Sequence, residues 1–358
     1  MFAYLFNLAF CCLLLYYYRD GNRDSRILFL YPVFLVWTII IGGQYSVGTD
    51  YPTYLEYFSS ENTIQRFEPI FQFLKDFFYS IGLRGQAMFF VFAFINVWAI
   101  FKAFKKFDLG QYALLYFLLV TISSFFNNQM NLVRQATAGA FVFWAFAEAF
   151  DGNVKKSVVL DVIAMGFHYS AVVVLPFLLF RKLTFFLTKW PKTLLVITLI
   201  SLFFSMTLAQ YINTFLFDML PNFIKQYTYY SVLRSSSYAT NVYGFSNVLP
   251  KVILIPLYWL SIGLLDGDEL NEKEKFLLRF GILSYALRCI MNITMIISRF
   301  ALYFWLPSII PLYFLILHYY NRKENIYAYA IVAYCLLPYI AKVFMGKGEY
   351  AYHFFLFS

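Results

Sequence analysis

Only a few ionisable side chains of this chain lie in apolar stretches long enough to cross a membrane. Arg134 lies near the start of one such stretch, His168 lies inside another, and Arg299 opens a third. An ionisable residue inside a membrane is energetically costly, so it marks a functional site by default. Guanidinium groups bind phosphate oxygens in a bidentate fork, and imidazole exchanges protons near neutral pH. These residues predict chemistry on a phosphate-bearing substrate.

Arg134 has small and polar neighbours. Amide side chains precede it, and residues small enough to admit another helix follow it: Asn127, Asn128, Gln129, Asn131, Gln135, Ala136, Ala138, Gly139 and Ala140. We expect Arg134, with Gln135 beside it, to clamp a phosphate or diphosphate. The alternative is an arginine that snorkels to the membrane interface, but its flank is small and polar rather than aliphatic.

Two further arginines could serve the same anion. Arg299 follows Ser298 at the predicted outer end of its run, where it could pair with Arg134 to neutralise a diphosphate. Arg288 lies nearer the middle of the membrane. It contacts the substrate, or it forms an ion pair inside the helix bundle with Asp161 or Glu148.

A polar, Gly-rich turn follows a predicted span directly at residues 42–54. Asp50 follows Gly48, which permits an unusual backbone, and it precedes Tyr51 and Tyr54. Asp50 is a candidate general base or sugar-hydroxyl acceptor, with a helix cap as the alternative. The same readings apply to Glu68, which precedes a proline. Tyrosine stacks on sugars and bonds hydroxyl groups, so Tyr51 and Tyr54 fit a carbohydrate ligand.

His168 is followed by Tyr169 and Ser170 within an apolar run. It is a candidate general base or phosphate partner, and a buried neutral histidine with one hydrogen bond is the alternative. His318 and His353 have weaker settings. The chain has no HExxH, P-loop or GxSxG motif, and we expect neither a metal nor a cofactor.

The composition indicates what kind of structural elements position these residues. The chain has 358 residues, of which 61% are hydrophobic and only 13% are charged, against roughly 25% charged in soluble domains. This predicts an all-α, polytopic integral membrane protein with one transmembrane domain over residues 1–358. The net charge of +9 sits mostly in short loops and no basic run is dense, which argues against nucleic acid. Cys11, Cys12, Cys289 and Cys335 lie in apolar runs without disulfide or zinc spacing.

Apolar runs near the length of about 20 residues that a span requires predict about eleven spanning helices. They cover residues 2–18, 27–43, 86–101, 111–126, 132–150, 157–180, 193–210, 248–265, 276–297, 300–318 and 326–344. Residues 69–83 are amphipathic and too short to span, so we expect them in the outer interface. The first run lacks a basic leader and is followed by arginines, so we expect an uncleaved span.

The distribution of Lys and Arg places residues 19–26, 102–110, 151–156 and 181–192 inside. Residues 157–180 must then enter the membrane from the inside and return to the inside. A re-entrant broken helix near His168 does so, because irregular backbone is tolerated at membrane depth where it is buried or lines a polar cavity. A single plain crossing is the alternative. Loops 44–85 and 211–247 then lie outside as the predicted substrate cap.

The order of these motifs resembles the EpsG-like branch of Wzy-type polysaccharide polymerases, over roughly residues 27–310. The similarity rests on Val47 to Tyr54, Phe67 to Pro69, Arg134 to Ala136, His168 to Ala171, and Arg299 with Tyr303 and Phe304. Many members of the family have an arginine shortly before the Gly-Thr-Asp-Tyr motif. Here the nearby polar residue is Gln44, which puts a third phosphate contact in doubt.

The resemblance implies a metal-independent glycosyltransferase in the bacterial inner membrane, active on its periplasmic face. It would move a growing glycan from polyprenyl diphosphate to the next lipid-linked repeat unit of an O-antigen or capsule. Asp50, Arg134, His168 and Arg299 would be catalytic, and the substrate would meet Tyr51, Tyr54, Glu68, Gln135, Tyr169, Ser170, Arg288 and Tyr303. A chain-length regulator is a partner that only the resemblance implies.

Three other functions fit the same residues less well. A flippase for the same lipid-linked oligosaccharide would need charges across the whole membrane depth, whereas most of these gather toward the outer half. A membrane O-acyltransferase could use His168 as a base, but no cytoplasmic site for an acyl donor is evident. A ligand-gated receptor lacks any gate or pore signal.

Overall fold

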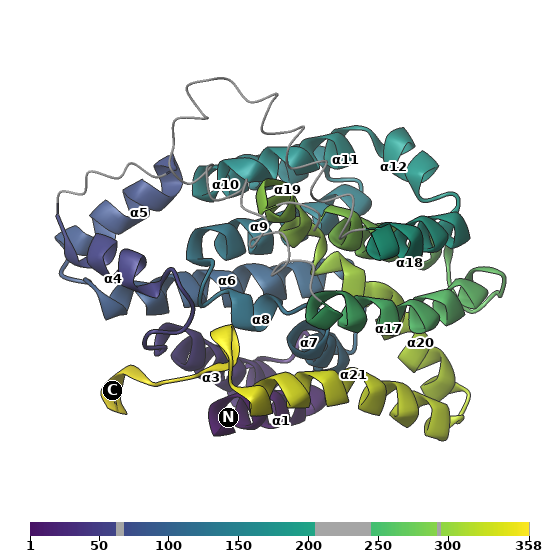
Figure 1. Cartoon of the computed structure of the whole chain (residues 1–358), viewed down its shortest axis with the longest axis horizontal. Helices are drawn as coiled ribbons and strands as arrows, with labels where there is room; N and C mark the ends of the chain where they lie inside the picture. The colour runs from purple at the N-terminus through teal and green to yellow at the C-terminus, as the bar shows by residue number, and fades with distance from the viewer. Residues whose placement is uncertain (62–67, 205–244, 292–294, 358) are drawn as a thin grey trace. The chain divides into compact units, whose positions relative to one another are not determined.

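The computed structural model describes residues 1–61, 68–204, 245–291 and 295–357. Most of the predicted cap loop at 211–247 and the motif residue Phe67 therefore lie outside the described residues. Within them the chain is helical, and the backbone bridge outside the helices joins Gln44 to Phe354. The predicted all-α class is confirmed (Figure 1).

The chain divides into two compact units, Met1–Arg181 with Tyr329–Ser358, and Lys182–Ala328. The first unit holds most of the predicted site residues, and the second holds Arg288, Arg299 and Tyr303. The single transmembrane domain expected from the sequence stays a prediction.

The first unit begins with α1 (Phe2–Tyr17), α2 (Arg23–Ser25), the π-helical turn η1 (Arg26–Leu30) and α3 (Tyr31–Gly42). α1 ends where charged residues follow its apolar run, and Asn22 caps the restart through its side chain. α1 packs on α3 and on α7 (Tyr112–Thr121), while α3 packs on α6 (Gln86–Phe107).

Two short helices lie between α3 and α6 in the chain, and each has a proline in its first turn. α4 spans Tyr51–Ser59 and α5 spans Pro69–Ser80. Proline suits a helix start because its missing N–H would have no partner there. The helix expected at 69–83 is present as α5, and its place in a membrane interface stays a prediction.

The core of the first unit is the packing of α9 (Val133–Phe150) between α6 and α10 (Val154–Phe167). α9 is buried along almost its whole length, and the alanines and glycine of its first half let its neighbours come close. α7 ends at Thr121, earlier than the predicted span. Ser124 has a left-handed φ of 61°, which redirects the chain into the short helix α8 (Phe125–Asn128).

The helical run after residue 154 breaks at His168, inside the segment where a break was predicted. His168 has extended backbone angles (φ −159°, ψ 116°), and η2 (Tyr169–Val174) and α11 (Leu175–Leu179) follow it. Both η2 and α11 contact α10, so the chain turns back beside α10 instead of continuing straight. Whether this break is re-entrant in a membrane stays a prediction.

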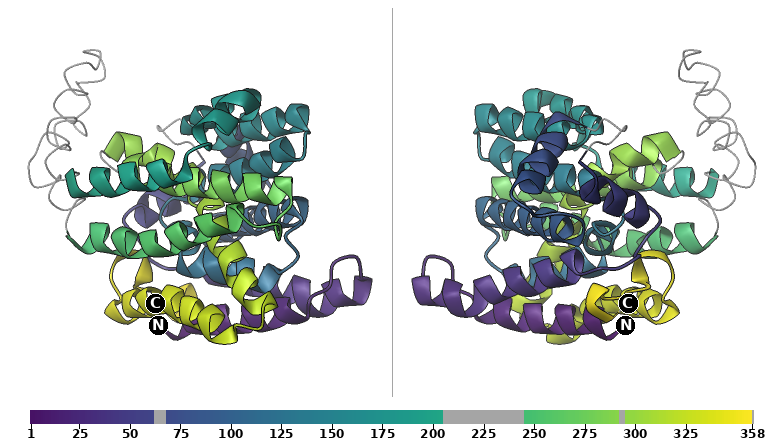
Figure 2. Two further views of the ribbon diagram at one scale, coloured as in Figure 1. Left: turned by 90° about the vertical axis from the view of Figure 1, so that its right-hand side faces the viewer. Right: turned by 90° about the vertical axis from the view of Figure 1, so that its left-hand side faces the viewer.

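The C-terminal segment of the first unit returns to the turn that follows α3. After α21 (Asn325–Met345), η7 (Gly348–Tyr350) and η8 (Phe355–Phe357) lie in a tail. The Phe355 N–H donates to the Gly43 carbonyl (3.0 Å) and the Tyr45 N–H donates to the His353 carbonyl (2.9 Å). The Tyr4 hydroxyl donates to the Glu349 carbonyl (2.6 Å), so the two ends of the chain lie on the same side of this unit (Figure 2).

The second unit contains the helix Pro191–Phe204, α17 (Phe245–Ile262), η3 (Gly263–Leu265), α18 (Glu272–Ile290), α19 (Met295–Ala301), η5 (Leu302–Phe304), η6 (Pro307–Ile309) and α20 (Ile310–Asn321). α12 (Arg181–Leu187) leads into it. A capping box between Asn271 and Glu274 starts α18. The Tyr258 ring stacks on Tyr285 at 3.8 Å, and its hydroxyl donates to the Ser308 carbonyl, which ties α17 to α18 and η6.

Four helical stretches of the described chain are long and apolar enough to cross a membrane. They are Arg23–Gly42, Gln86–Phe107, Val248–Leu265 and Asn325–Met345, and a fifth candidate is the pair Ser298–Phe304 and Pro307–Asn321, bent by 54°. The protein is therefore a polytopic membrane protein, while the count of about eleven spans stays a prediction.

Gly166 sets the distance between α10 and α5, and we expect a methyl group there to be destabilising. A Cβ at Gly166 would lie 2.4 Å from Cδ1 and 2.9 Å from Cβ of Ile70. Gly166→Ala should lower the free energy of unfolding by about 1–3 kcal/mol, the usual cost of overpacking. The apparent thermal midpoint in detergent measures this. Gly263→Ala is the control, since a Cβ there meets nothing within 4 Å, and equal midpoints for the two variants would contradict the prediction.

Candidate functional site

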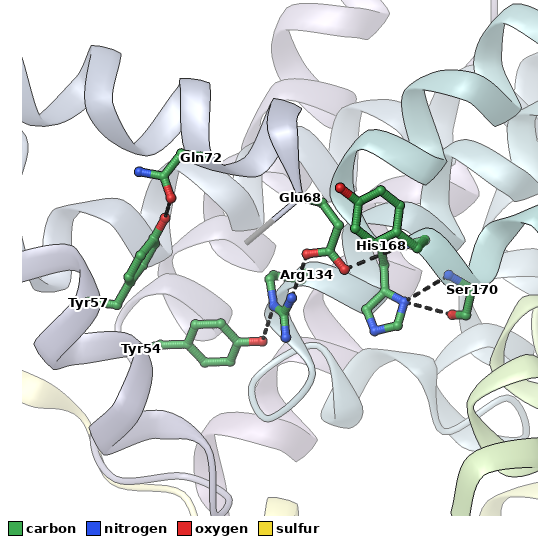
Figure 3. Close-up of polar contacts among 8 residues, drawn as sticks. Tyr54, Tyr57, Glu68, Gln72, Arg134, His168 and Ser170 are labelled. Atoms are coloured by element: carbon green, nitrogen blue, oxygen red, sulfur yellow. Dashed lines mark hydrogen bonds and ion pairs between the residues drawn. The ribbon is translucent and has the colours of Figure 1, made fainter. Parts of the chain in front are cut away.

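Three elements of the first unit meet at the N-terminus of α9: its first turn, the start of α5, and the break after α10 (Figure 3). Arg134 is the second residue of α9, Glu68 immediately precedes α5, and His168 is the residue at the break. The close approach of Gly166 to Ile70 brings the start of α5 to the break. Residues far apart in the sequence thus converge as a polar cluster.

Glu68 connects all three elements. Its Oε2 lies 2.5 Å from Arg134 Nη1, and its Oε1 accepts the backbone N–H of Tyr169 at 3.4 Å. The carboxylate side chain is 7% exposed and that of Arg134 is 22% exposed, so water screens this pair less than a surface pair. Glu68 uses both of its oxygens inside the protein, which identifies it as a residue that positions Arg134.

Tyr54 fixes the other edge of the guanidinium. Arg134 Nε donates to the Tyr54 hydroxyl at 3.3 Å, and the Phe71 ring centroid lies 6.0 Å from the guanidinium carbon. Burial raises the pKa of the Tyr54 phenol, and Arg134 only partly opposes this effect. The phenol therefore stays protonated at neutral pH and serves as a hydrogen-bonding group, not as a base.

His168 is held in one tautomer. Its Nδ1 accepts the backbone N–H of Ser170 at 3.3 Å and lies 2.7 Å from Ser170 Oγ. A backbone N–H can only donate, so Nδ1 carries its lone pair and the proton of the neutral ring is on Nε2. In this state Nε2 carries an N–H group, which is a hydrogen-bond donor and not a base.

Asp50 lies in a turn that Asn131 holds. The Asp50 N–H donates to Asn131 Oδ1 (3.0 Å), and Thr49 Oγ1 donates to Asp50 Oδ1 (3.2 Å). Gly48 has φ +79°, and a Cβ there would lie 2.5 Å from Asn131 Oδ1, so only glycine fits. Asp50 occupies the N-cap position of α4, but its side chain makes no capping hydrogen bond. Its carboxylate is exposed and available for chemistry.

The amide side chains of half-buried Gln86 and buried Gln44 support this turn. Gln86 Nε2 donates to the carbonyls of Gly42 (2.5 Å) and Gln44 (2.8 Å), and Gln86 Oε1 accepts the Tyr51 hydroxyl (2.7 Å). Gln44 Nε2 donates to the Met130 carbonyl (2.7 Å) in the α8–α9 connection. Tyr51, predicted to bind substrate, therefore has a structural partner for its hydroxyl. Gln44 ties two segments together without adding a charge.

The remaining predicted residues are distributed as follows. Gln135 is buried on α9, and the side chain of Tyr169 is 61% exposed although its backbone belongs to the cluster. Arg288, Arg299 and Tyr303 lie in the second unit on α18, α19 and η5, and the Arg288 guanidinium carbon lies 5.6 Å from the Trp305 ring centroid. Glu148, one proposed partner of Arg288, pairs with Lys156 (2.6 Å) and Lys106 (3.7 Å). The pairing of Arg299 with Arg134 stays a prediction.

Sequence reasoning missed Asn131, Gln86 and Glu349 as supports of the site. Asn131 Nδ2 donates to Glu349 Oε1 at 3.4 Å, which links the Asp50 turn to the C-terminal tail. Asn131 belongs to the amide run that drew attention before Arg134, but Glu349 had no signal, because its partner is distant in the sequence. In the described part of the chain no group of His, Cys, Asp and Glu could hold a metal ion, and metal independence stays a prediction.

This cluster has the parts of an anion site. The cluster lies at the N-terminus of α9, where the helix dipole favours negative charge. Arg134 adds a cationic guanidinium, whose charge Glu68 partly offsets, and Glu68 and Tyr54 hold it in place. A phosphate group is the ligand that such an arrangement binds best.

The Glu68–Arg134 pair should show strong coupling in a double-mutant cycle. We expect Glu68→Ala, Arg134→Ala and the double variant to give a coupling energy of about 1–2 kcal/mol. This lies below the cost of breaking a fully buried pair because Arg134 is partly exposed. Thermal unfolding of the purified variants measures it. The control is the exposed pair Lys105–Asp20 (3.4 Å), for which about 0.5 kcal/mol or less is expected; equal coupling in both cycles would contradict the prediction.

Comparison with known proteins places the chain in a family. A model described as the EpsG family matches residues 27–356, which is most of the chain. No curated protein and no solved structure matches it. The family supports a glycosyltransferase- or polymerase-like role in polysaccharide biosynthesis, in accord with the order of the motifs. This multi-pass membrane protein therefore belongs to the EpsG family.

Proposed function

We propose that this protein is a polysaccharide polymerase that uses a lipid-linked donor. It transfers a growing glycan from polyprenyl diphosphate to a hydroxyl of the next lipid-linked repeat unit, at the outer face of the bacterial inner membrane. The observation that carries the proposal is the Arg134 guanidinium, fixed by Glu68 and Tyr54 at the N-terminus of α9. Such a site suits the diphosphate leaving group.

The leaving group needs positive charge most when the glycosidic bond breaks. The bond between the anomeric carbon and the phosphate oxygen breaks as the bond to the acceptor oxygen forms, and its electron pair leaves with the diphosphate. Donors held in place before the reaction stabilise this developing charge without reorganisation. Arg134 is such a donor because Glu68 and Tyr54 hold its guanidinium in place. The Nε2–H of His168 is a second one in the same cluster.

The acceptor hydroxyl must lose a proton, and Asp50 is the base that the geometry supports best. Asp50 directly precedes α4, the helix that carries Tyr54, and its carboxylate is exposed. Both oxygens of Glu68, by contrast, bond Arg134 and Tyr169. The His168 tautomer presents a donor, so it gives little support to a membrane O-acyltransferase with a histidine base. Arg299 and Arg288 remain proposed contacts of the diphosphate, and a chain-length regulator remains a proposed partner.

Removal of the Arg134 charge should abolish polymer formation while export of single units continues. In a deletion strain of the native host, complementation with Arg134→Ala should give single repeat units at the surface and no long-chain ladder on a glycan gel. Arg134→Lys should restore the long-chain ladder partly, since lysine keeps the positive charge but lacks the bidentate geometry of the guanidinium. Arg23→Ala, an exposed arginine outside the cluster, is the control for expression. Loss of surface single units with precursor accumulating inside would instead indicate a flippase.

Asp50 and His168 should differ in the size of their effects. With purified protein and lipid-linked repeat unit, Asp50→Asn should lower the rate by about 10²–10⁴-fold, as expected for loss of a general base. His168→Gln keeps an N–H donor, and we expect about a tenfold loss, smaller than the 10²–10³-fold cost of removing an oxyanion donor. The pH profile should change for Asp50→Asn only. The opposite ranking would assign the base to His168.

A further inference from the structure

A second polar site in the first unit lies apart from the Arg134 cluster. A pocket of about 270 Å³ opens between the C-terminal end of α1, η1, α3, the last turns of α6 and the start of α7. None of its lining residues belongs to the proposed catalytic machinery. The pocket therefore needs an explanation of its own.

The pocket lies at one end of two candidate spans. Arg26 is near the start of the span Arg23–Gly42, and Lys102 and Lys105 are in the last turns of Gln86–Phe107. These two spans pack on each other through α3 and α6. Basic residues at this end fit the side that the positive-inside rule assigns to the cytoplasm. The pocket thus occurs where lipid headgroups meet the protein.

The charges in the pocket favour an anion. Arg26, Lys102 and Lys105 line it, and Asp20 is the acidic residue among the lining side chains. Asp20 is engaged by Lys105 (3.4 Å) and by the Tyr18 hydroxyl (3.0 Å). No described carboxylate lies within ion-pair distance of Arg26 or Lys102, whose ammonium lies 5.8 Å from the Trp98 ring centroid. The positive charges of Arg26 and Lys102 therefore have no carboxylate to offset them in the described part of the chain.

The rest of the wall is apolar and aromatic. Leu30, Phe34, Trp98 and Phe101 line it, with the rings of Phe34 and Phe101 4.8 Å apart. Arg26 and Leu30 belong to the π-helical turn η1, a rare element that often occurs at functional sites. A cationic rim above an apolar wall matches a molecule with an anionic head and a hydrocarbon tail.

We propose that this pocket binds an anionic phospholipid of the surrounding leaflet. Its phosphate lies between Arg26 and Lys102, and its glycerol and upper acyl carbons lie against Phe34, Trp98 and Phe101. A volume of about 270 Å³ is enough for a phosphoglycerol headgroup. This inference is independent of the proposed polymerase activity.

Native mass spectrometry of the full-length protein tests the proposal. The protein is released from nanodiscs of phosphatidylglycerol and phosphatidylcholine in equal amounts, and the retained lipids are counted. Wild type should retain one phosphatidylglycerol in preference to phosphatidylcholine. Arg26→Gln with Lys102→Gln should reduce that preference by about tenfold or more, because each basic residue near a membrane contributes several-fold to the binding of anionic lipid. Lys105 is left intact so that Asp20 keeps its partner.

The matched control changes the same number of charges elsewhere. Lys155 and Lys323 are exposed and outside the pocket, so Lys155→Gln with Lys323→Gln should keep the wild-type preference. Size-exclusion profiles of all three proteins confirm that they are folded. Equal retention of the two lipids by wild type, or an unchanged preference in the double variant, would overturn the proposal. An inorganic phosphate adduct that is lost with Arg26 and Lys102, without phosphatidylglycerol retention, would replace the lipid with a free phosphate.

Discussion

The ion pair between Glu68 and Arg134 is the interaction on which the candidate site depends. One oxygen of Glu68 accepts a hydrogen bond from the Arg134 guanidinium, and the other accepts one from the Tyr169 N–H. One carboxylate thus joins α5, α9 and the segment after α10. Without Arg134 this poorly screened carboxylate would have no counter-charge, which would cost free energy. That cost favours the arrangement in which the three elements stay together. The pair also explains why an arginine is tolerated in the first turn of a helix, where the dipole disfavours positive charge.

The break at His168 is a consequence of the same geometry. α10 approaches α5 closely at Gly166, and the chain then leaves the helix, which frees the Tyr169 N–H from its helical acceptor and directs it to Glu68. The imidazole satisfies the next N–H, that of Ser170, and its tautomer is fixed by that bond. Backbone geometry and side-chain chemistry thus determine each other, and the ring nitrogen turned away from Ser170 carries the proton.

The Asp50 turn shows a different kind of support, built from neutral amides. Asn131 and Gln86 bind backbone groups of the turn, Gln44 ties the turn to the Met130 carbonyl, and the C-terminal tail adds backbone bonds at Gly43 and Tyr45. Amides donate and accept without charge, so they can be buried beneath a site whose electrostatics must favour an anion. The lipid pocket at the basic end of α3 and α6 uses cations instead, because its ligand brings the compensating charge.

The sequence by itself determined the helical membrane class, the helix expected at 69–83 and found at Pro69–Ser80, the break near His168, and Arg134 and Glu68 as candidate site residues. These features follow from local composition, from proline and glycine positions, and from the cost of charge in apolar surroundings. It could not determine that Glu68 pairs with Arg134, or that Tyr51 bonds Gln86. Nor could it predict that Glu349 reaches Asn131. These roles depend on which residues packing brings within about 3 Å, and hydrogen bonds fall off too steeply with distance and angle for spacing along the chain to specify them.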